Sequence, residues 1–176
     1  MATSTDAQLV ARCRTGEPEA WSELVERFSR YVYAICVQAF HLRPHDAEDV
    51  FQDVFARVYV NLDKLRSDDA VRPWIAQLTR RLCIDRLRAG RRESPVDVDE
   101  LDTDVEGTIG SIDEAMAVRA GLDALGDPCR EILDRFFSRD ESYKSIADAL
   151  GLPAGTVASR ISRCLTKLRA ELEGRS

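Results

Sequence analysis

The sequence predicts an all-α protein with two small helical domains, residues 1–92 and 113–176, joined by an acidic flexible linker at residues 93–112. Apolar residues recur every three or four positions along most of the chain, and no segment alternates convincingly with the period of two expected of a strand. Charge divides the chain in the same places, because residues 93–114 carry nine acidic side chains and no Lys or Arg. That segment also holds a proline and two glycines without a helical period, which is typical of a linker.

Length and composition limit the class of protein. The chain has 176 residues, of which 44% are hydrophobic, enough for one ordinary domain or two small ones. Its longest apolar stretch, residues 31–42, is well short of the roughly 20 residues that span a bilayer, so we expect no membrane insertion. The N-terminus has no apolar core behind a basic leader and does not resemble a secretory signal. We therefore expect a cytoplasmic protein.

The cysteines and histidines predict neither a disulfide framework nor a metal centre. Five cysteines form an odd set without a CxxC pair, so we expect reduced thiols at Cys13, Cys36, Cys83, Cys129 and Cys164. His41 and His45 have the i, i+4 spacing of some metal ligands, but Pro44 lies between them and no third ligand is evident. We predict no metal and no cofactor.

Three amphipathic helices are predicted in the first domain. The first follows the break at residues 16–18, with an apolar face of Leu24, Phe28, Tyr31, Ile35 and Phe40. The second begins near Asp46 and places three valines on one face, Val50, Val54 and Val58. The third follows residues 67–69 and runs from Trp74 to Leu87. Beyond the linker, two shorter helices divided at residues 126–128 are predicted by Leu122, Leu125, Ile132, Leu133 and Phe136.

Residues 143–169, YKSIADALGLPAGTVASRISRCLTKLR, predict a helix-turn-helix. Gly151 permits a tight turn after a short helix, and Pro153 fits the first turn of the next helix. The inward face predicted for the second helix is Val157, Ile161, Leu165 and Leu168. Its outward face is Thr156, Ser159, Arg160, Arg163 and Lys167. Because residues 154–169 hold four basic groups and no acid, this helix suits the major groove of DNA, although a helical hairpin with a solvated basic face is the alternative.

Residues 72–92 form a second basic concentration, with one acid, Asp85. Its seven arginines are Arg72, Arg80, Arg81, Arg86, Arg88, Arg91 and Arg92. Such a helix suits the neutralisation of phosphates and contact with unpaired bases, whereas the plain alternative is a solvated face. We expect Trp74 in the core rather than on a base-stacking platform.

Three carboxylates form a stripe in the segment DAEDVFQDVF, where Asp46, Asp49 and Asp53 share one helix face beside Gln52. Such a stripe could hold a divalent cation, serve acid–base chemistry, meet a basic protein partner or be solvated. Composition alone favours solvation, and no accompanying histidine, nucleophile or glycine-rich phosphate loop supports an enzyme. We therefore predict no catalytic residue.

Four segments in this order resemble the extracytoplasmic-function (ECF) sigma factors, small members of the bacterial sigma-70 family, and the resemblance covers essentially the whole chain. Residues 6–28 resemble the family's opening helices and residues 46–65 its helix that binds core RNA polymerase. Residues 72–92 are similar to its minus-ten-reading helix and residues 143–169 to its minus-thirty-five-reading helix-turn-helix. The resemblance implies a sigma factor that binds core polymerase, recognises both promoter elements and assists promoter melting.

The resemblance also assigns residues to surfaces. It implies contact with core polymerase for Asp46, Asp49, Gln52 and Asp53. In the loop that captures a base flipped from the minus-ten single strand, it implies DNA contact for Asn61, Lys64 and Arg66. On the minus-ten helix it implies DNA contact for Arg80, Arg81, Asp85, Arg86 and Arg88. It implies contact with duplex minus-thirty-five DNA for Thr156, Ser159, Arg160, Arg163 and Lys167.

The chain departs from the family pattern at three positions in its DNA-binding segments. Arg81 stands where relatives usually carry Asn, Ala158 replaces a common Lys, and Leu165 replaces a common Arg or Lys. The last two changes remove possible phosphate contacts, and each lost contact lowers the salt dependence of binding by about one unit of slope. We therefore expect low affinity of the free protein for DNA.

The implied partners are core RNA polymerase, promoter DNA and a cognate anti-sigma factor, which in relatives is often bound to the membrane. The acidic linker suggests two hypotheses. Its carboxylates could imitate a nucleic-acid backbone inside the positive channel of the polymerase. They could instead fold back on the basic faces of the free protein and suppress DNA binding.

Two other functions remain open from the residues. A stand-alone helix-turn-helix regulator would bind duplex operators without polymerase, but it leaves the carboxylate stripe at residues 46–53 unexplained. A metal- or nucleotide-dependent enzyme would use the same carboxylates and predicts thermal stabilisation by a cation.

Overall fold

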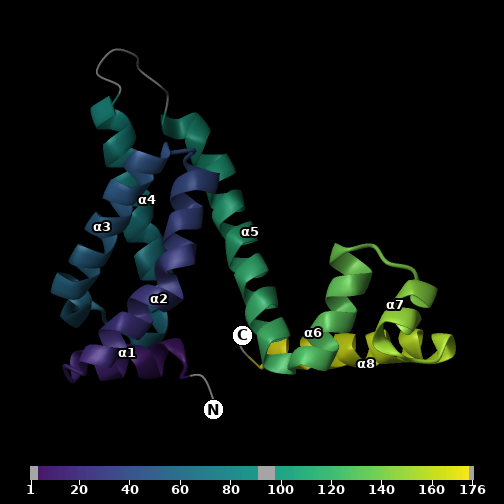
Figure 1. The fold of residues 1–176 in the computed structure, drawn as a ribbon. Helices are drawn as coiled ribbons and strands as arrows, with labels where there is room; N and C mark the ends of the chain where they lie inside the picture. The colour runs from purple at the N-terminus through teal and green to yellow at the C-terminus, as the bar shows by residue number, and fades with distance from the viewer. Residues whose placement is uncertain (1–3, 91–97, 175–176) are drawn as a thin grey trace. The chain divides into compact units, whose positions relative to one another are not determined.

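The computed structural model describes residues 4–90 and 98–174, and every regular element in these residues is helical (Figure 1). The chain forms two compact units, Met1–Asp113 and Glu114–Ser176, which we call unit 1 and unit 2. None of the helices in the described residues is long and apolar enough to cross a bilayer. The prediction of an all-α protein is confirmed.

Unit 1 is a bundle of helices whose ends are set by local turn chemistry. Its elements are α1 (Asp6–Arg14), α2 (Pro18–Ala34), η1 (Ile35–Ala39), α3 (Pro44–Asn61), η2 (Leu62–Lys64), η3 (Asp68–Ala70), α4 (Val71–Gly90) and the first half of α5 (Val98–Leu125). Thr5 caps α1, because its hydroxyl accepts from the Gln8 N–H while the Gln8 side chain accepts from the Thr5 N–H. Gly16, at φ +80°, makes the turn into α2, which has Pro18 in its first turn.

The apolar faces predicted for the first three helices form the core of unit 1. From α2, η1 and the residue after it, the buried side chains include Leu24, Phe28, Tyr31, Ile35 and Phe40. From α3 they include Val50, Val54 and Val58, and from α4 they include Val71, Ile75, Leu82 and Cys83. Trp74 is half-buried. α3 begins at Pro44, two residues before the predicted start, because a proline in the first turn lacks only an N–H that has no partner within the helix.

Arg72 joins four helices of unit 1. Its guanidinium carbon lies 5.2 Å from the ring centre of Phe28 and 5.1 Å from that of Tyr31, both on α2. It also forms ion pairs with Asp6 at the start of α1, at 3.5 Å, and with Asp113 of α5, at 4.0 Å. Because the cation–π and ionic contacts act on one half-buried group, Arg72 holds α4 against α1, α2 and α5.

Residues 93–112, predicted to be a flexible linker, include the start of α5. Residues 93–97 lie outside the described residues, but the rest of the predicted linker is helical. Val105, Ile109 and Ile112 are buried at the spacing of one helix face. This short apolar stripe was missed because the many acidic residues around it lower the average hydrophobicity of the segment.

Unit 2 contains the helix-turn-helix predicted from the sequence. Its elements are the second half of α5, α6 (Asp127–Leu133), η4 (Asp134–Ser138), α7 (Tyr143–Leu150) and α8 (Ala154–Glu173). Gly151 ends α7 in the left-handed conformation, at φ +63°, and the chain then enters α8 after Pro153. The predicted break at residues 126–128 is present, but the first of the two short helices expected there is the end of the longer α5.

The inward face of α8 differs from the prediction by one residue. Val157, Ile161 and Cys164 are buried, and Leu168 is half-buried. Leu165, predicted to face inward, is 38% exposed. The period of an α-helix explains the difference, since positions three and four residues apart lie on one face and Cys164 follows Ile161 by three.

The cysteines contradict the expectation of five reduced thiols. Cys129 of α6 and Cys164 of α8 form a disulfide. The free thiols are Cys13, Cys36 and Cys83, and all three are buried. The sequence separation of 35 between the bonded cysteines gave no sign that the fold brings them together.

An ionic network joins α1 to α2. Arg12 donates from Nε to Glu17, at 3.0 Å, and from Nη1 to Glu23, at 2.7 Å. Hydrogen bonds from Arg12 lower the pKa of both carboxyls below their ordinary value of 4.5. Arg27 extends the network, because it pairs with Glu23 and with Asp6.

Acidification is expected to destabilise unit 1 through this network. Carboxyls with a lower pKa in the folded chain stabilise it above about pH 4.5 and lose this effect as the pH falls through the folded pKa. We expect Arg12→Met to reduce the fall in melting temperature between about pH 6 and about pH 3. Fluorescence of Trp21 and Trp74, both in unit 1, reports the melting. An unchanged pH dependence in the variant would contradict the assignment.

Candidate nucleic-acid interface

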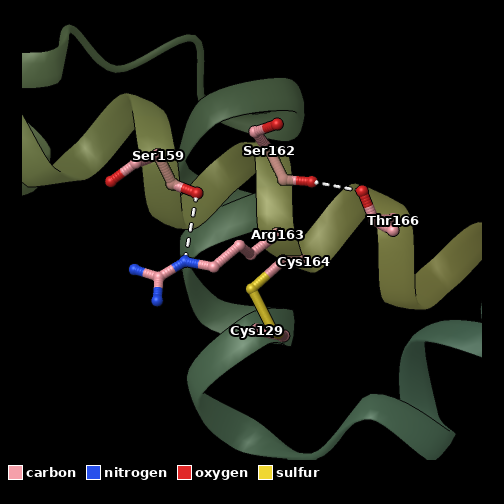
Figure 2. Close-up of a disulfide and its surroundings, with 6 residues drawn as sticks. All are labelled: Cys129, Ser159, Ser162, Arg163, Cys164 and Thr166. Carbon is pink, nitrogen blue, oxygen red and sulfur yellow. Dashed lines mark hydrogen bonds between the residues drawn. A yellow bond between two sulfur atoms is a disulfide. The ribbon is translucent and has the colours of Figure 1, made fainter.

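The outer face of α8 carries the residues predicted to contact duplex DNA. Ser159, Arg160, Arg163 and Lys167 are exposed, and Thr156 is half-buried. The Thr156 hydroxyl donates to the Pro153 carbonyl at 2.7 Å, and the Ser159 hydroxyl donates to the Thr156 carbonyl at 3.0 Å. The Arg163 Nε lies 3.4 Å from the Ser159 carbonyl oxygen (Figure 2), and the Arg163 side chain is exposed.

The helix-turn-helix presents this face because the opposite face of α8 is packed. Val157 and Ile161 lie in one apolar cluster with Ile146 and Ala147 of α7. The Ser142 hydroxyl accepts from the Ser145 N–H and so caps α7. A rigid pair of helices with an exposed, acid-free basic face has the shape and charge that suit a major groove.

The exposed charged residues of the basic helix α4 are Arg81, Asp85 and Arg88, which we call the outer α4 face. These residues follow one another at spacings of four and three, so they share one side of the helix. All three were predicted to contact the minus-ten element. The other two residues of α4 that were predicted to contact this element are Arg80 and Arg86. Both pair with carboxylates of unit 1.

Arg80 lies against α5. Its Nη1 is 3.3 Å from a carboxylate oxygen of Glu106, and its side chain is 26% exposed. Glu106 belongs to the segment predicted to be a linker, so that segment contacts the basic helix of unit 1. The carboxylate of Glu106 therefore pairs with an arginine that was predicted to contact DNA.

Arg86 brings two predicted surfaces together. Its Nε donates to Asp46 at 2.9 Å, and its Nη2 donates to Asp49 at 2.8 Å. The hydrogen bond with Asp46 is the main cause that raises the pKa of Arg86 above its ordinary value. Arg86, predicted as a DNA contact, therefore neutralises two carboxylates predicted to bind polymerase.

The carboxylate stripe of α3 therefore has a paired part and an exposed part. Asp46 and Asp49 are half-buried and paired with Arg86, whereas Gln52 and Asp53 are exposed. The imidazole of His45 is 3.7 Å from Asp49. Among the described residues no group of three or more His, Cys, Asp or Glu side chains is placed to hold a metal ion.

The loop after α3 is held by a residue that sequence reasoning did not select. Arg14 of α1 donates to the Leu65 carbonyl at 2.6 Å and to the Asp68 carboxylate at 3.0 Å. Within the loop, Lys64 donates to the Asn61 side-chain oxygen at 2.8 Å, and Arg66 is exposed. No sequence signal marks Arg14, because its partners lie more than 50 residues away.

Two further surface features were missed from the sequence. A groove of about 530 Å³ lies between α2, η1 and α3, and its lining includes Arg30, Tyr33 and Phe51. At the end of α3, Tyr59 is 66% exposed and its ring centre is 4.7 Å from that of Trp21. Both features join residues from separate helices, so the period of a single helix does not reveal them.

Comparisons with known proteins match the two units in order. Residues 24–93 match the family model of sigma-70 region 2, and residues 121–170 match that of sigma-70 region 4. The chain is 24% identical to the ECF RNA polymerase sigma factor SigW of Bacillus subtilis, with 93% of this chain and 94% of that protein covered. It is 30% identical to the RNA polymerase sigma factor NccH of Alcaligenes xylosoxydans xylosoxydans, with 97% and 96% covered. The solved structure of CnrH in complex with the cytosolic domain of CnrY has 24% identity and a TM-score of 0.44, with 97% and 99% covered.

The different surroundings of the arginines on α4 predict different effects of substitution. Arg86→Ala leaves Asp46 and Asp49 facing each other without their cation, so we expect a lower melting temperature for unit 1. The double variant Arg81→Ala with Arg88→Ala removes exposed charges from the outer α4 face and should change the melting temperature little. Tryptophan fluorescence during thermal unfolding measures both. Equal melting temperatures for Arg86→Ala and the unsubstituted protein would show that the Arg86 ion pairs do not stabilise the fold.

Proposed function

This chain belongs to the sigma-70 family, in its extracytoplasmic-function (ECF) group, and from that membership we propose how its surfaces divide the work of a sigma factor. It is an RNA polymerase sigma factor that serves transcription initiation. The observation that carries this conclusion is the match of region 2 to unit 1 and of region 4 to unit 2. A stand-alone regulator is not favoured, because it gives the region 2 match in unit 1 no role.

The proposed division of the chain follows its charge and its folded units. Residues 1–92 would bind core polymerase and the minus-ten element, and residues 113–176 would bind the minus-thirty-five element. The segment between them, residues 93–112, would connect the two functions, and its helical part would remain packed on unit 1. The burial of Val105 and Ile109 supports this last point.

We assign the polymerase contact to the exposed part of α3. Gln52 and Asp53 are open to a basic partner, so they would make the first contact. Asp46 and Asp49 would contribute after a partner's cation displaces Arg86, because the three groups already form a compact ionic cluster. Long-range attraction by the exposed carboxylates favours rapid association.

Single-stranded minus-ten DNA is assigned to the outer α4 face and to the adjoining loop. Arg81, Arg88 and Arg66 are exposed cations suited to phosphates, and Asp85 is a hydrogen-bond acceptor for a base. Asn61 and Lys64 are held by their mutual hydrogen bond near a loop that Arg14 fixes. A loop with a fixed shape lowers the entropy lost when it captures a flipped base.

Duplex minus-thirty-five DNA is assigned to the outer face of α8. Arg160 and Arg163 have the donor geometry for guanine edges or phosphates, and Lys167 suits a phosphate. Thr156 and Ser159 supply hydroxyls at the start of the helix, which is the part of a recognition helix that reaches base edges.

The remaining partner assignments rest on the exposed surfaces. The protein would act by binding rather than by catalysis. A cognate anti-sigma factor that covers the exposed polymerase and DNA faces would keep it inactive. Because core polymerase and promoter DNA are in the cytoplasm, we place the protein there, where an anti-sigma factor in the membrane would hold it at the inner surface.

Transcription in vitro with core polymerase and genomic DNA tests the function directly. We expect RNA 5′ ends that share two upstream motifs and appear only when the protein is added. Asp53→Arg reverses an exposed charge on the proposed polymerase face, so it should weaken core association by at least about 10-fold, the effect of roughly 1.4 kcal/mol.

The matched control for Asp53→Arg is Glu19→Arg. Glu19 is also an exposed helical carboxylate in unit 1, but it lies at the start of α2, outside the proposed surfaces. Core association should be unaffected in this variant. Equal core affinity of the Asp53→Arg and Glu19→Arg variants would remove the polymerase assignment from α3, whereas a lack of dependent transcripts would contradict the function itself.

Substitutions on α8 separate base reading from phosphate binding. Arg160→Ala should weaken binding to the preferred duplex by about 1–3 kcal/mol and relax base preference at one position. Lys167→Ala should weaken binding to all duplexes alike and lower the salt slope by about one. Fluorescence anisotropy of holoenzyme with labelled duplexes at several salt concentrations measures both. The assignment of Arg160 fails if its variant loses affinity equally for all sequences.

A further inference from the structure

The Cys129–Cys164 disulfide connects α6 to the middle of α8, the proposed recognition helix (Figure 2). The two Cα atoms are 5.4 Å apart and the cysteines are 35 residues apart in sequence. The loop that the bond closes contains η4, α7, the turn at Gly151 and the first half of α8. One covalent bond therefore closes a loop around α7, the turn and the first half of α8.

Unit 2 has a small buried core. Its buried core is a cluster of eight residues, Cys129, Ile132, Leu133, Ile146, Ala147, Val157, Ile161 and Cys164. Two of these eight are the bonded cysteines. A unit of about 60 residues buries a smaller fraction of its surface than a large domain does, and small domains often depend on a covalent or metal crosslink. A covalent bond within so small a core is placed to contribute to the stability of unit 2.

The bond also fixes the proposed DNA face. Cys164 directly follows Arg163, whose Nε meets the Ser159 carbonyl on the adjacent turn (Figure 2). The side chains of a helix have fixed angular positions around its axis. Holding Cys164 against α6 therefore keeps Arg163 and Ser159 facing outward. Loss of the bond would leave α8 attached to α6 by apolar contacts alone at this point.

The other close pair of cysteines provides a contrast. Cys36 and Cys83 are buried in unit 1, with their sulfur atoms 3.7 Å apart and not bonded. They lie within the apolar core of unit 1, which has more buried residues than that of unit 2. Burial also raises the pKa of the third free thiol, Cys13, to about 11, so it stays protonated and unreactive near neutral pH.

We propose that the Cys129–Cys164 disulfide is a thiol-responsive staple that sets the stability of unit 2. A dithiol reductant donates two electrons and two protons, so the S–S bond becomes two thiols while the reductant forms its own disulfide. The reverse exchange restores the staple. Both cysteines are 7% exposed, so exchange proceeds through transient opening of unit 2 and the oxidised state resists brief exposure to reductant.

Hydrogen exchange of the full chain tests the staple. The protein is equilibrated with oxidised or with reduced dithiothreitol, and peptide mapping by mass spectrometry verifies the Cys129–Cys164 bond in each sample. We expect the amides of α6 and α8 to exchange at least about 100-fold faster after reduction, because the unfolded chain regains the freedom that the closed loop removed. Peptides of α2 and α3 in unit 1 should change little and serve as the internal reference.

Two variants separate this bond from other thiols. Cys129→Ala with Cys164→Ala should exchange rapidly in α6 and α8 under both conditions. Cys36→Ala with Cys83→Ala should keep the full redox response of unit 2. Exchange in α6 and α8 that is equal in the oxidised and reduced protein, or a failure of the bond to form with oxidised dithiothreitol, would overturn the proposal.

A measurement of DNA binding tests the staple separately from the function proposed for α8. If α8 reads duplex DNA, reduction should weaken binding of the full chain to the minus-thirty-five duplex, and reoxidation should restore it. A redox-dependent hydrogen exchange with unchanged DNA affinity would support the staple and count against the assignment of α8 to DNA. The two proposals therefore fail in different measurements.

Discussion

The guanidinium of Arg72 lies where α1, α2, α4 and α5 meet, and the arrangement of unit 1 depends on this contact. A cation placed against two buried rings has lost much of its water, so it requires nearby carboxylates. Asp6 and Asp113 supply these carboxylates, and the two residues lie near the two ends of the unit 1 sequence. Once Arg72 fixes the position and rotation of α4, the same rotation decides which of its other arginines face outward and which face α3 or α5.

More arginines of unit 1 form ion pairs within the unit than its sequence suggests. Arg72, Arg80 and Arg86 pair with carboxylates of their own unit, so the basic segment offers a narrower surface to nucleic acid than its composition implies. The affinity of a protein for DNA follows the number of phosphates that it neutralises, and internal pairing lowers that number. This allocation is consistent with a sigma factor whose DNA contacts gain strength from the polymerase to which it is bound.

Unit 2 has a different constraint, because it must hold the helix-turn-helix with a small core. Close packing is one means, since a Cβ at Gly121 would lie 2.9 Å from a methyl carbon of Leu168, so α5 and α8 approach each other where a side chain is absent. The disulfide between Cys129 and Cys164 is the other. Both contacts use the inner face of α8 and leave its outer face available, which is the arrangement that a helix-turn-helix needs.

The sequence by itself determined most of the helices, the helix-turn-helix and the basic outer face of α8, because caps, turns and helical periods depend on residues a few positions apart. The family match to regions 2 and 4 agrees with that reading. The tertiary structure alone decided that α5 packs on unit 1, that Arg86 turns toward Asp46, and that Cys129 reaches Cys164. Each of these depends on which distant residues the packed helices bring within a few ångströms, and local periodicity carries no information about such neighbours.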